Sequence, residues 1–84
     1  MDMMAKRVIV YTQPHCASCQ QVTDYLRERG VDYELKDVAG DGAALRELAA
    51  LGFMTTPVTI VGETAIAGFQ RKKLERVLSE HGNV

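Results

Sequence analysis

The chain of 84 residues is long enough for one domain with a modest hydrophobic core, and we expect residues 1–84 to form a single domain. Ten basic residues balance eleven acidic ones to a formal charge of −1, which gives no general attraction to nucleic acid or anionic membranes. No apolar run reaches the roughly 18–20 residues that span a bilayer, and the first residues lack the apolar core of a signal peptide. We therefore expect a cytoplasmic protein that binds neither nucleic acid nor membranes.

The first half of the chain predicts a strand, a helix and a second strand. Val8 to Tyr11 is a short, mostly β-branched run, typical of a strand buried on both faces. From Ala17 to Arg29 the residues of one face recur every three or four positions, which predicts an amphipathic helix ended by Gly30. Val31 to Asp37 alternates between apolar and polar residues, which predicts a strand with one buried face near a sheet edge.

The second half predicts a helix, a β-hairpin and a last helix. Asp41 is a suitable N-cap for a helix over Ala43 to Leu51. Val58 to Val61 and Thr64 to Ala67 predict two strands joined by a tight turn, and a helix is expected from Gln70 to about Glu80. The inner face of the middle helix is expected to carry Leu45, Leu48 and Ala49, and that of the last helix Leu74, Val77, Leu78 and His81.

The order of elements is therefore β-α-β-α-β-β-α, an α/β fold. The first two strands are joined by a helix and should be parallel, whereas the last two form an antiparallel hairpin. These pairings predict a four-stranded mixed sheet with helices on both faces.

Both cysteines lie in the segment Cys16-Ala17-Ser18-Cys19, at the predicted junction of the first strand and helix. A Cys-x-x-Cys pair at such a junction indicates a redox-active dithiol. A structural zinc site needs four ligands, and His15 and His81 are poorly placed to complete one. Covalent haem attachment requires a histidine directly after the second cysteine, where Gln20 stands. We expect no metal site in the chain.

The two cysteines are expected to play different roles. Cys16 lies where the helix begins, and the free N–H groups and the dipole there favour the thiolate, so Cys16 is the expected nucleophile. Cys19 faces inward and is expected to resolve the mixed disulfide. His15 is either a donor or cation that favours the thiolate, or an exposed loop histidine. A basic cluster at the start of the last helix is either a solvated face or a rim that stabilises the Cys16 thiolate and steers an acidic partner; its members are Arg71, Lys72, Lys73 and Arg76.

Three motifs in this order resemble the thioredoxin fold in its short glutaredoxin form. They are Tyr11-Thr12 before the cysteine pair, Thr55-Thr56-Pro57-Val58 before the hairpin, and Gly68-Phe69 before the last helix. The resemblance implies a cis Thr56–Pro57 bond that faces the dithiol. It also implies a dithiol-disulfide oxidoreductase that reduces protein disulfides. The residues that it places in contact with the substrate are Gln13, Thr56, Pro57, Val58, Gly68, Phe69, Gln70 and Arg71.

The same resemblance raises the question of the reductant. Typical glutaredoxins carry a lysine at the position of Gln13, which helps to hold glutathione, and acidic residues at those of Gln70 and Arg71. The chain also resembles the glutaredoxin-like redoxins that serve ribonucleotide reductase and are reduced by thioredoxin reductase. The resemblance therefore implies a monomer without a tightly bound cofactor, reduced by thioredoxin reductase or glutathione. A glutathione-dependent or iron–sulfur-binding glutaredoxin, and a redox sensor without turnover, remain the alternatives.

Overall fold

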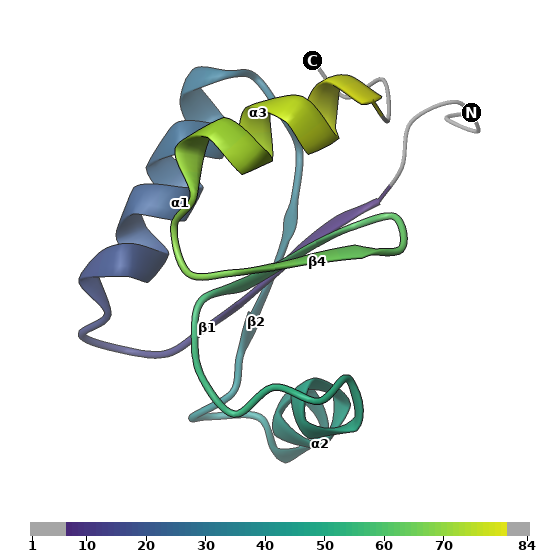
Figure 1. Ribbon diagram of the computed structural model, residues 1–84. Helices are drawn as coiled ribbons and strands as arrows, with labels where there is room; N and C mark the ends of the chain where they lie inside the picture. The colour runs from purple at the N-terminus through teal and green to yellow at the C-terminus, as the bar shows by residue number, and fades with distance from the viewer. Residues whose placement is uncertain (1–6, 81–84) are drawn as a thin grey trace.

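The computed structural model describes residues 7–80, which form the seven elements in the expected order (Figure 1). The α/β fold is confirmed, and most element bounds lie within one residue of the predicted ones. His81, expected on the inner face of the last helix, lies outside the described residues. The elements are β1 (Val8–Thr12), α1 (Ala17–Glu28), β2 (Glu34–Asp37), α2 (Gly42–Ala50), β3 (Val58–Val61), β4 (Thr64–Ala67) and α3 (Arg71–Glu80).

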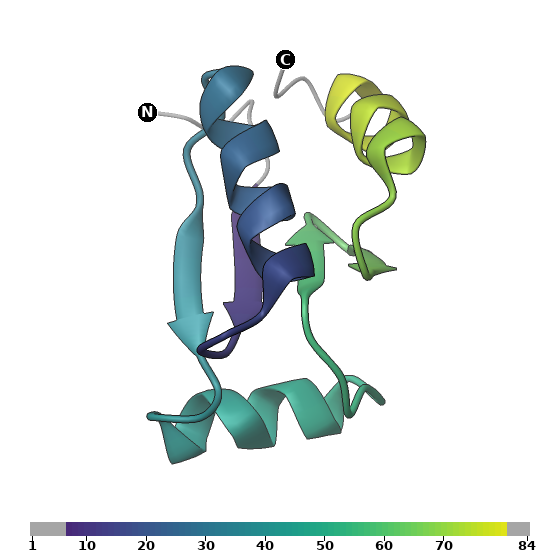
Figure 2. The same ribbon diagram turned by 90° about the vertical axis from the view of Figure 1, so that its left-hand side faces the viewer.

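The four strands form one mixed sheet in the order β2-β1-β3-β4. β1 runs parallel to β2 and antiparallel to β3, and β3 pairs antiparallel with β4. α1 and α3 lie on one face of this sheet, and α2 lies on the other (Figures 1 and 2). The mixed sheet with helices on both faces is therefore confirmed.

Alternation along the strands divides the core into two layers. The layer under α1 and α3 is the larger, and the layer under α2 is smaller. Each fully buried Leu, Ile or Val contributes roughly 1.5–3 kcal/mol, so both layers hold the helices firmly on the sheet. The larger layer contains Val8, Val10, Val22, Tyr25, Leu26, Val31, Val61, Ile66, Leu74, Val77 and Leu78; the smaller contains Tyr11, Val38, Ala44, Leu48 and Val58.

The end of α1 explains why the following strand is shorter than predicted. Gly30 takes a positive φ of 69° and donates its N–H to Arg27 O at 3.1 Å. The N–H of Val31 donates to Leu26 O at 2.9 Å, which completes a Schellman motif. Val31 is thus part of the helix end, and β2 begins only at Glu34. The prediction of a strand from Val31 was wrong in its first three residues, while its position at the sheet edge is confirmed. The predicted buried face was also wrong, because no residue of β2 is buried and Leu35 is 54% exposed.

The inner face of α2 also differs from the prediction. Ala44 and Leu48 are buried, whereas Leu45 is 46% exposed and Ala49 is exposed. Asp41 caps the helix as predicted and accepts the N–H of Ala44 at 3.4 Å. Ala44 and Leu48 are four residues apart and so share one side of the helix, and the small Ala44 allows α2 to lie close to the sheet.

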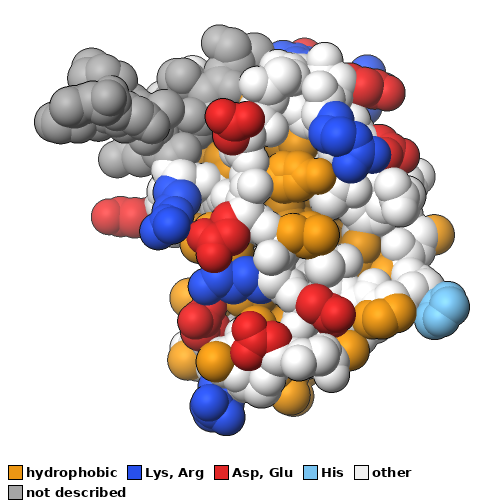
Figure 3. Space-filling model, turned by 180° about the vertical axis from the view of Figure 1, so that it is seen from behind, with side chains coloured by type: hydrophobic (Ala, Val, Ile, Leu, Met, Phe, Trp, Pro, Cys, Tyr) orange, Lys and Arg blue, Asp and Glu red, His pale blue; other side chains and the backbone are white. Residues whose placement is uncertain are grey.

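The surface carries both charge signs and a few exposed apolar side chains. On the face shown in Figure 3, acidic and basic side chains are interspersed, with apolar side chains visible between them. None of the helices between residues 7 and 80 is long and apolar enough to cross a membrane. The large apolar side chains exposed in this range are Leu35, Leu45, Leu51 and Met54.

Candidate active site

The dithiol loop runs from the end of β1 to the first turn of α1. His15 has φ 61°, a left-handed conformation that is uncommon for a residue other than glycine. Cys16 follows as the N-cap of α1, and its Sγ accepts the N–H of Cys19 at 3.2 Å. The sulfur of Cys16 therefore lies at the positive end of the helix, where free N–H groups stabilise an anion.

Cys16 and Cys19 form a disulfide, with their Cα atoms 5.2 Å apart. Cys16 is half-buried, whereas Cys19 is 3% exposed and faces the core. An incoming substrate can therefore reach the sulfur of Cys16 more easily than that of Cys19. This difference agrees with the expected roles of Cys16 as the nucleophile and Cys19 as the resolving cysteine.

The Thr56–Pro57 peptide bond is cis, as predicted, and faces the dithiol loop. Thr56 Oγ1 lies 3.9 Å from the Sγ of Cys16, although the two residues are 40 positions apart in the chain. The carbonyl oxygen of Pro57 accepts the N–H of Gly68 at 2.8 Å, so the second and third motifs are joined. The Val58 side chain is buried towards α2, which leaves only its backbone to take part in binding a substrate.

Phe69 and Gln70 connect β4 to α3. Phe69 is half-buried and contacts Tyr25 edge to face, with the ring centroids 6.3 Å apart. The side-chain amide of Gln70 donates to Ala67 O at 2.7 Å. Gln70 therefore closes the end of β4, a local role that the sequence did not reveal.

Arg71 lies against α1. Its guanidinium is 5.6 Å from the ring centroid of Tyr25, and that of Arg29 is 5.4 Å from the same ring. Tyr25 follows Cys16 by nine residues, which is about 13 Å along a helix axis. Arg71 thus packs against the C-terminal part of α1, whereas Cys16 precedes its first turn. No motif marks Tyr25 as part of this region; its signal in the sequence is an aromatic residue on the inner face of α1.

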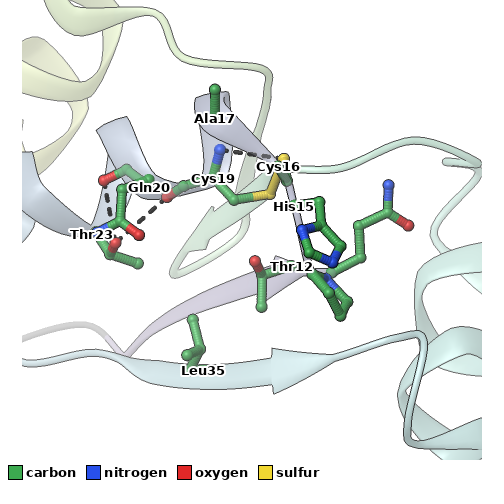
Figure 4. A pocket seen from close by; sticks show the side chains of 10 residues that line it. Thr12, His15, Cys16, Ala17, Cys19, Gln20, Thr23 and Leu35 are labelled. Atoms are coloured by element: carbon green, nitrogen blue, oxygen red, sulfur yellow. Dashed lines mark hydrogen bonds between the residues drawn. A yellow bond between two sulfur atoms is a disulfide. The ribbon is translucent and has the colours of Figure 1, made fainter.

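A cavity of about 510 Å³ opens beside the dithiol, between α1 and β2 (Figure 4). Gln13 lines it, together with both cysteines and His15. Leu35 also lines it and is 54% exposed, because α1 does not cover the edge strand completely. Nothing in the sequence indicated that Leu35 would lie beside the dithiol. The complete lining is Thr12, Gln13, Pro14, His15, Cys16, Ala17, Cys19, Gln20, Thr23 and Leu35.

A polar cluster on the other face of the sheet ties α2 to the strands. Tyr11 donates its hydroxyl to Glu47 Oε1 at 3.0 Å, and Lys36 Nζ donates to the same oxygen at 2.7 Å. The hydrogen bond from Lys36, followed by that from Tyr11, lowers the pKa of Glu47. Burial, followed by the bond to Glu47, raises the pKa of Tyr11. Tyr11 is therefore a core residue that anchors α2.

The fold and the site together define a class: a thioredoxin-fold protein with a dithiol at the start of a helix and a cis-proline opposite it. A model of the glutaredoxin family matches residues 8–66. Since this match covers well over half of the chain, the chain belongs to the glutaredoxin family.

Known relatives agree with this assignment. The glutaredoxin-like protein NrdH of Escherichia coli K12 is 31% identical over 71 residues, which cover 84% of this chain and 88% of the relative. The thioredoxin-like protein BC3987 superimposes with a TM-score of 0.83 at 37% identity, covering 86% of this chain and all of that structure. The NrdH-redoxin structure from Escherichia coli gives a TM-score of 0.77 at 31% identity and covers 83% and 92% of the two chains.

The protein is therefore a thiol–disulfide oxidoreductase whose redox pair is Cys16 and Cys19. In its reaction the two thiols of the reduced protein lose two electrons to a substrate disulfide, which leaves as two thiols. The protein retains the disulfide that the structure shows.

Proposed function

We propose that this protein reduces a disulfide in a protein client and is then reduced by thioredoxin reductase rather than by glutathione. We further propose that it works in the cytoplasm as a monomer without a tightly bound cofactor. The observation that carries the choice of reductant is the first turn of α3, which contains no acidic residue.

Glutathione presents a γ-glutamyl ammonium group, which needs a carboxylate partner. At the positions where typical glutaredoxins supply one, this chain has Gln70, whose amide is bonded to Ala67, and Arg71, whose guanidinium stacks on Tyr25. A guanidinium repels the ammonium group, and Gln13 offers no charge to the glutathione carboxylate. The NrdH-redoxin of Escherichia coli is described as having a thioredoxin-like activity profile, which supports the same choice here.

The residues do not fit an iron–sulfur cluster that uses glutathione as a co-ligand, because the same carboxylate is missing. We therefore propose a cofactor-free protein. Purification without oxygen should give a colourless protein, and a brown one with visible absorption would contradict the proposal.

We propose that an extended segment of the client binds along Thr56 and Pro57. The backbone N–H and C=O of Thr56 form no hydrogen bond within residues 7–80, and the side-chain hydroxyl of the same residue lies 3.9 Å from the sulfur of Cys16. Two apolar side chains are available to the client: Met54, which precedes Thr56 in the sequence and is 84% exposed, and Phe69, which follows it and is half-buried. A client strand could thus be held by its backbone while its disulfide meets Cys16.

The reductant is tested by supplying oxidised protein with NADPH and either thioredoxin reductase or glutathione with glutathione reductase. We expect NADPH consumption with thioredoxin reductase and little with the glutathione system. Faster reduction by the glutathione system would overturn the proposal. An insulin reduction assay in the same mixture separates turnover from a sensor that is reduced only once.

Restoring the missing charge gives a sharper test. Arg71→Asp places a carboxylate where glutathione needs one and should raise the rate with glutathione. Lys72→Asp makes the same charge change one residue further along α3 and is the matched control. Equal rates for both variants would mean that only the net charge matters.

The basic cluster is proposed to steer an acidic partner. Arg71 stacks on Tyr25, which follows Cys16 by about 13 Å along the axis of α1, a separation greater than the screening length of about 10 Å at 0.1 M salt. Its effect on the thiolate is therefore small, whereas long-range attraction of a partner remains effective at low salt. The association rate with thioredoxin reductase should fall as salt rises; a rate that is independent of salt would exclude steering.

A further inference from the structure

The resolving step requires a thiolate at Cys19, and the structure supplies little to produce one. The Cys19 side chain is 3% exposed, and its sulfur takes part in no hydrogen bond within residues 7–80. Cys16, in contrast, has the N–H of Cys19 at 3.2 Å and the hydroxyl of Thr56 at 3.9 Å. Within residues 7–80 no carboxylate is buried that could accept the proton of Cys19. Apart from the tyrosines, the buried polar side chains in this range are Thr23 and Thr59. The proton of Cys19 must therefore leave through another route.

The cavity beside the dithiol provides that route. Cys19 lines it together with Cys16 and His15 (Figure 4). Apart from the two cysteines, His15 is the single titratable side chain among its ten lining residues. The left-handed φ of 61° fixes the backbone of His15 directly before the first turn of α1. The His15 side chain is exposed, as one of the two readings of the sequence expected, and Figure 4 shows its imidazole beside the dithiol loop near Thr12.

Other charged groups near the loop are already engaged. Asp24 on α1 accepts from Gln20 at 3.0 Å and pairs with Arg27. Asp37, at the end of β2, accepts the N–H groups of Ala39 and Gly40 within its own turn. Neither carboxylate lines the cavity, and residues 53–57, which carry the cis bond, include no charged side chain. From α3, Arg71 is stacked on Tyr25.

We propose that the imidazole of His15 accepts the proton of Cys19 in the resolving step through water in the cavity that both residues line. At that stage Cys16 is joined to the client by a mixed disulfide. As the proton moves to the imidazole, the Cys19 sulfur bonds to the Cys16 sulfur and the bond between Cys16 and the client sulfur breaks. The client leaves as a thiolate and takes a proton from the imidazolium or from solvent. The client is thereby reduced by two electrons and the protein is oxidised to its disulfide.

The two chemical steps can be separated with dithiobis-nitrobenzoate, a small coloured disulfide that needs no client. Attack by Cys16 releases the first thionitrobenzoate in a phase that depends on reagent concentration. Attack by Cys19 releases the second in a phase that does not. In His15→Asn, a residue that also tolerates positive φ, we expect the second phase near neutral pH to slow by at least about tenfold, the low side of what a positioned acid–base group contributes. The first phase should change little.

A purely structural role for His15 predicts a different set of results. If His15 accepts the proton, the difference between His15→Asn and the native protein should vanish at high pH, where hydroxide removes the Cys19 proton without help; a purely structural role would leave the difference in place at every pH. His15→Gly adopts φ 61° without strain, so it remains testable if His15→Asn does not fold. Added imidazole should restore its second phase. A second phase that is equal in native protein and variants at every pH would overturn the proposal. So would slowing confined to the first phase, which would assign His15 to Cys16 instead. Neither result depends on the identity of the reductant.

Discussion

The contact between Thr56 and Cys16 predicts how much of the nucleophile's reactivity comes from the cis-proline loop. Thr56→Val keeps the shape of the side chain and removes the hydroxyl that lies 3.9 Å from the sulfur. A hydrogen bond to a charged group is worth roughly 1.5–3 kcal/mol, and this distance is close to the outer limit for sulfur. We therefore assign about 1 kcal/mol, which lowers the ratio of thiolate to thiol at Cys16 by about fivefold.

The reaction rate should fall less than the thiolate population. A more basic thiolate is a better nucleophile, with a Brønsted slope of about 0.4–0.5, so about half of the loss on a logarithmic scale is recovered. We expect alkylation of reduced Thr56→Val at acidic pH to be about twofold slower than that of the native protein. Ultraviolet absorption of the thiolate should show the full fivefold change.

Thr55→Val is the matched control, because Thr55 is exposed and has no side-chain hydrogen bond within residues 7–80. It should leave both measurements unchanged. Superimposable pH profiles for Thr56→Val and the native protein would refute the reasoning, since they would show that the hydroxyl does not stabilise the thiolate.

Three further predictions concern the dithiol and the stability of α2. Cys16→Ser should abolish reduction of a disulfide client, whereas Cys19→Ser should accumulate a mixed disulfide that mass spectrometry detects; turnover by Cys16→Ser would exclude it as the nucleophile. The hydrogen bond from Lys36 lowers the pKa of Glu47 in the folded protein. The bond therefore stabilises the fold at pH values above the ordinary glutamate pKa of 4.5, and this stabilisation is lost as the pH falls through the lower pKa of the folded state. Native protein should therefore be more stable than Glu47→Gln near neutral pH, and urea unfolding should show the difference shrinking in acid. Leu48→Ala should lower the unfolding free energy by about 2–5 kcal/mol, because Leu48 is 1% exposed; a loss below about 1 kcal/mol would mean that the α2 layer can collapse around the gap.

The order of elements could be predicted because each one has a distinct pattern in the sequence. The β-branched run of β1 and the three- and four-residue spacing of α1 are local features, and glycine marks the end of two helices. The start of β2 could not be predicted in this way. The alternation of apolar and polar residues continues back to Val31, but backbone hydrogen bonds determine where the strand starts. The N–H of Val31 donates to Leu26 O at the end of α1 and is not available to the sheet.

The site could be predicted only where a motif identifies it. Cys16 and Pro57 belong to local motifs, so their roles and the cis bond were accessible from the sequence. The stacking of Arg71 on Tyr25 and the position of Leu35 beside the dithiol depend on how α1 sits over the sheet. No pattern within one element contains that information, because the contacts join segments that are far apart in the chain.

The environments of the two sulfurs also bear on the order of the reaction. Cys16 has polar neighbours that stabilise its thiolate before any client arrives, namely the helix N–H groups and the hydroxyl of Thr56. Cys19 is buried against the core and has none of these, so its deprotonation is unfavourable until a neighbour accepts the proton. The mixed disulfide with the client must therefore form first, and its lifetime depends on how fast the proton leaves Cys19.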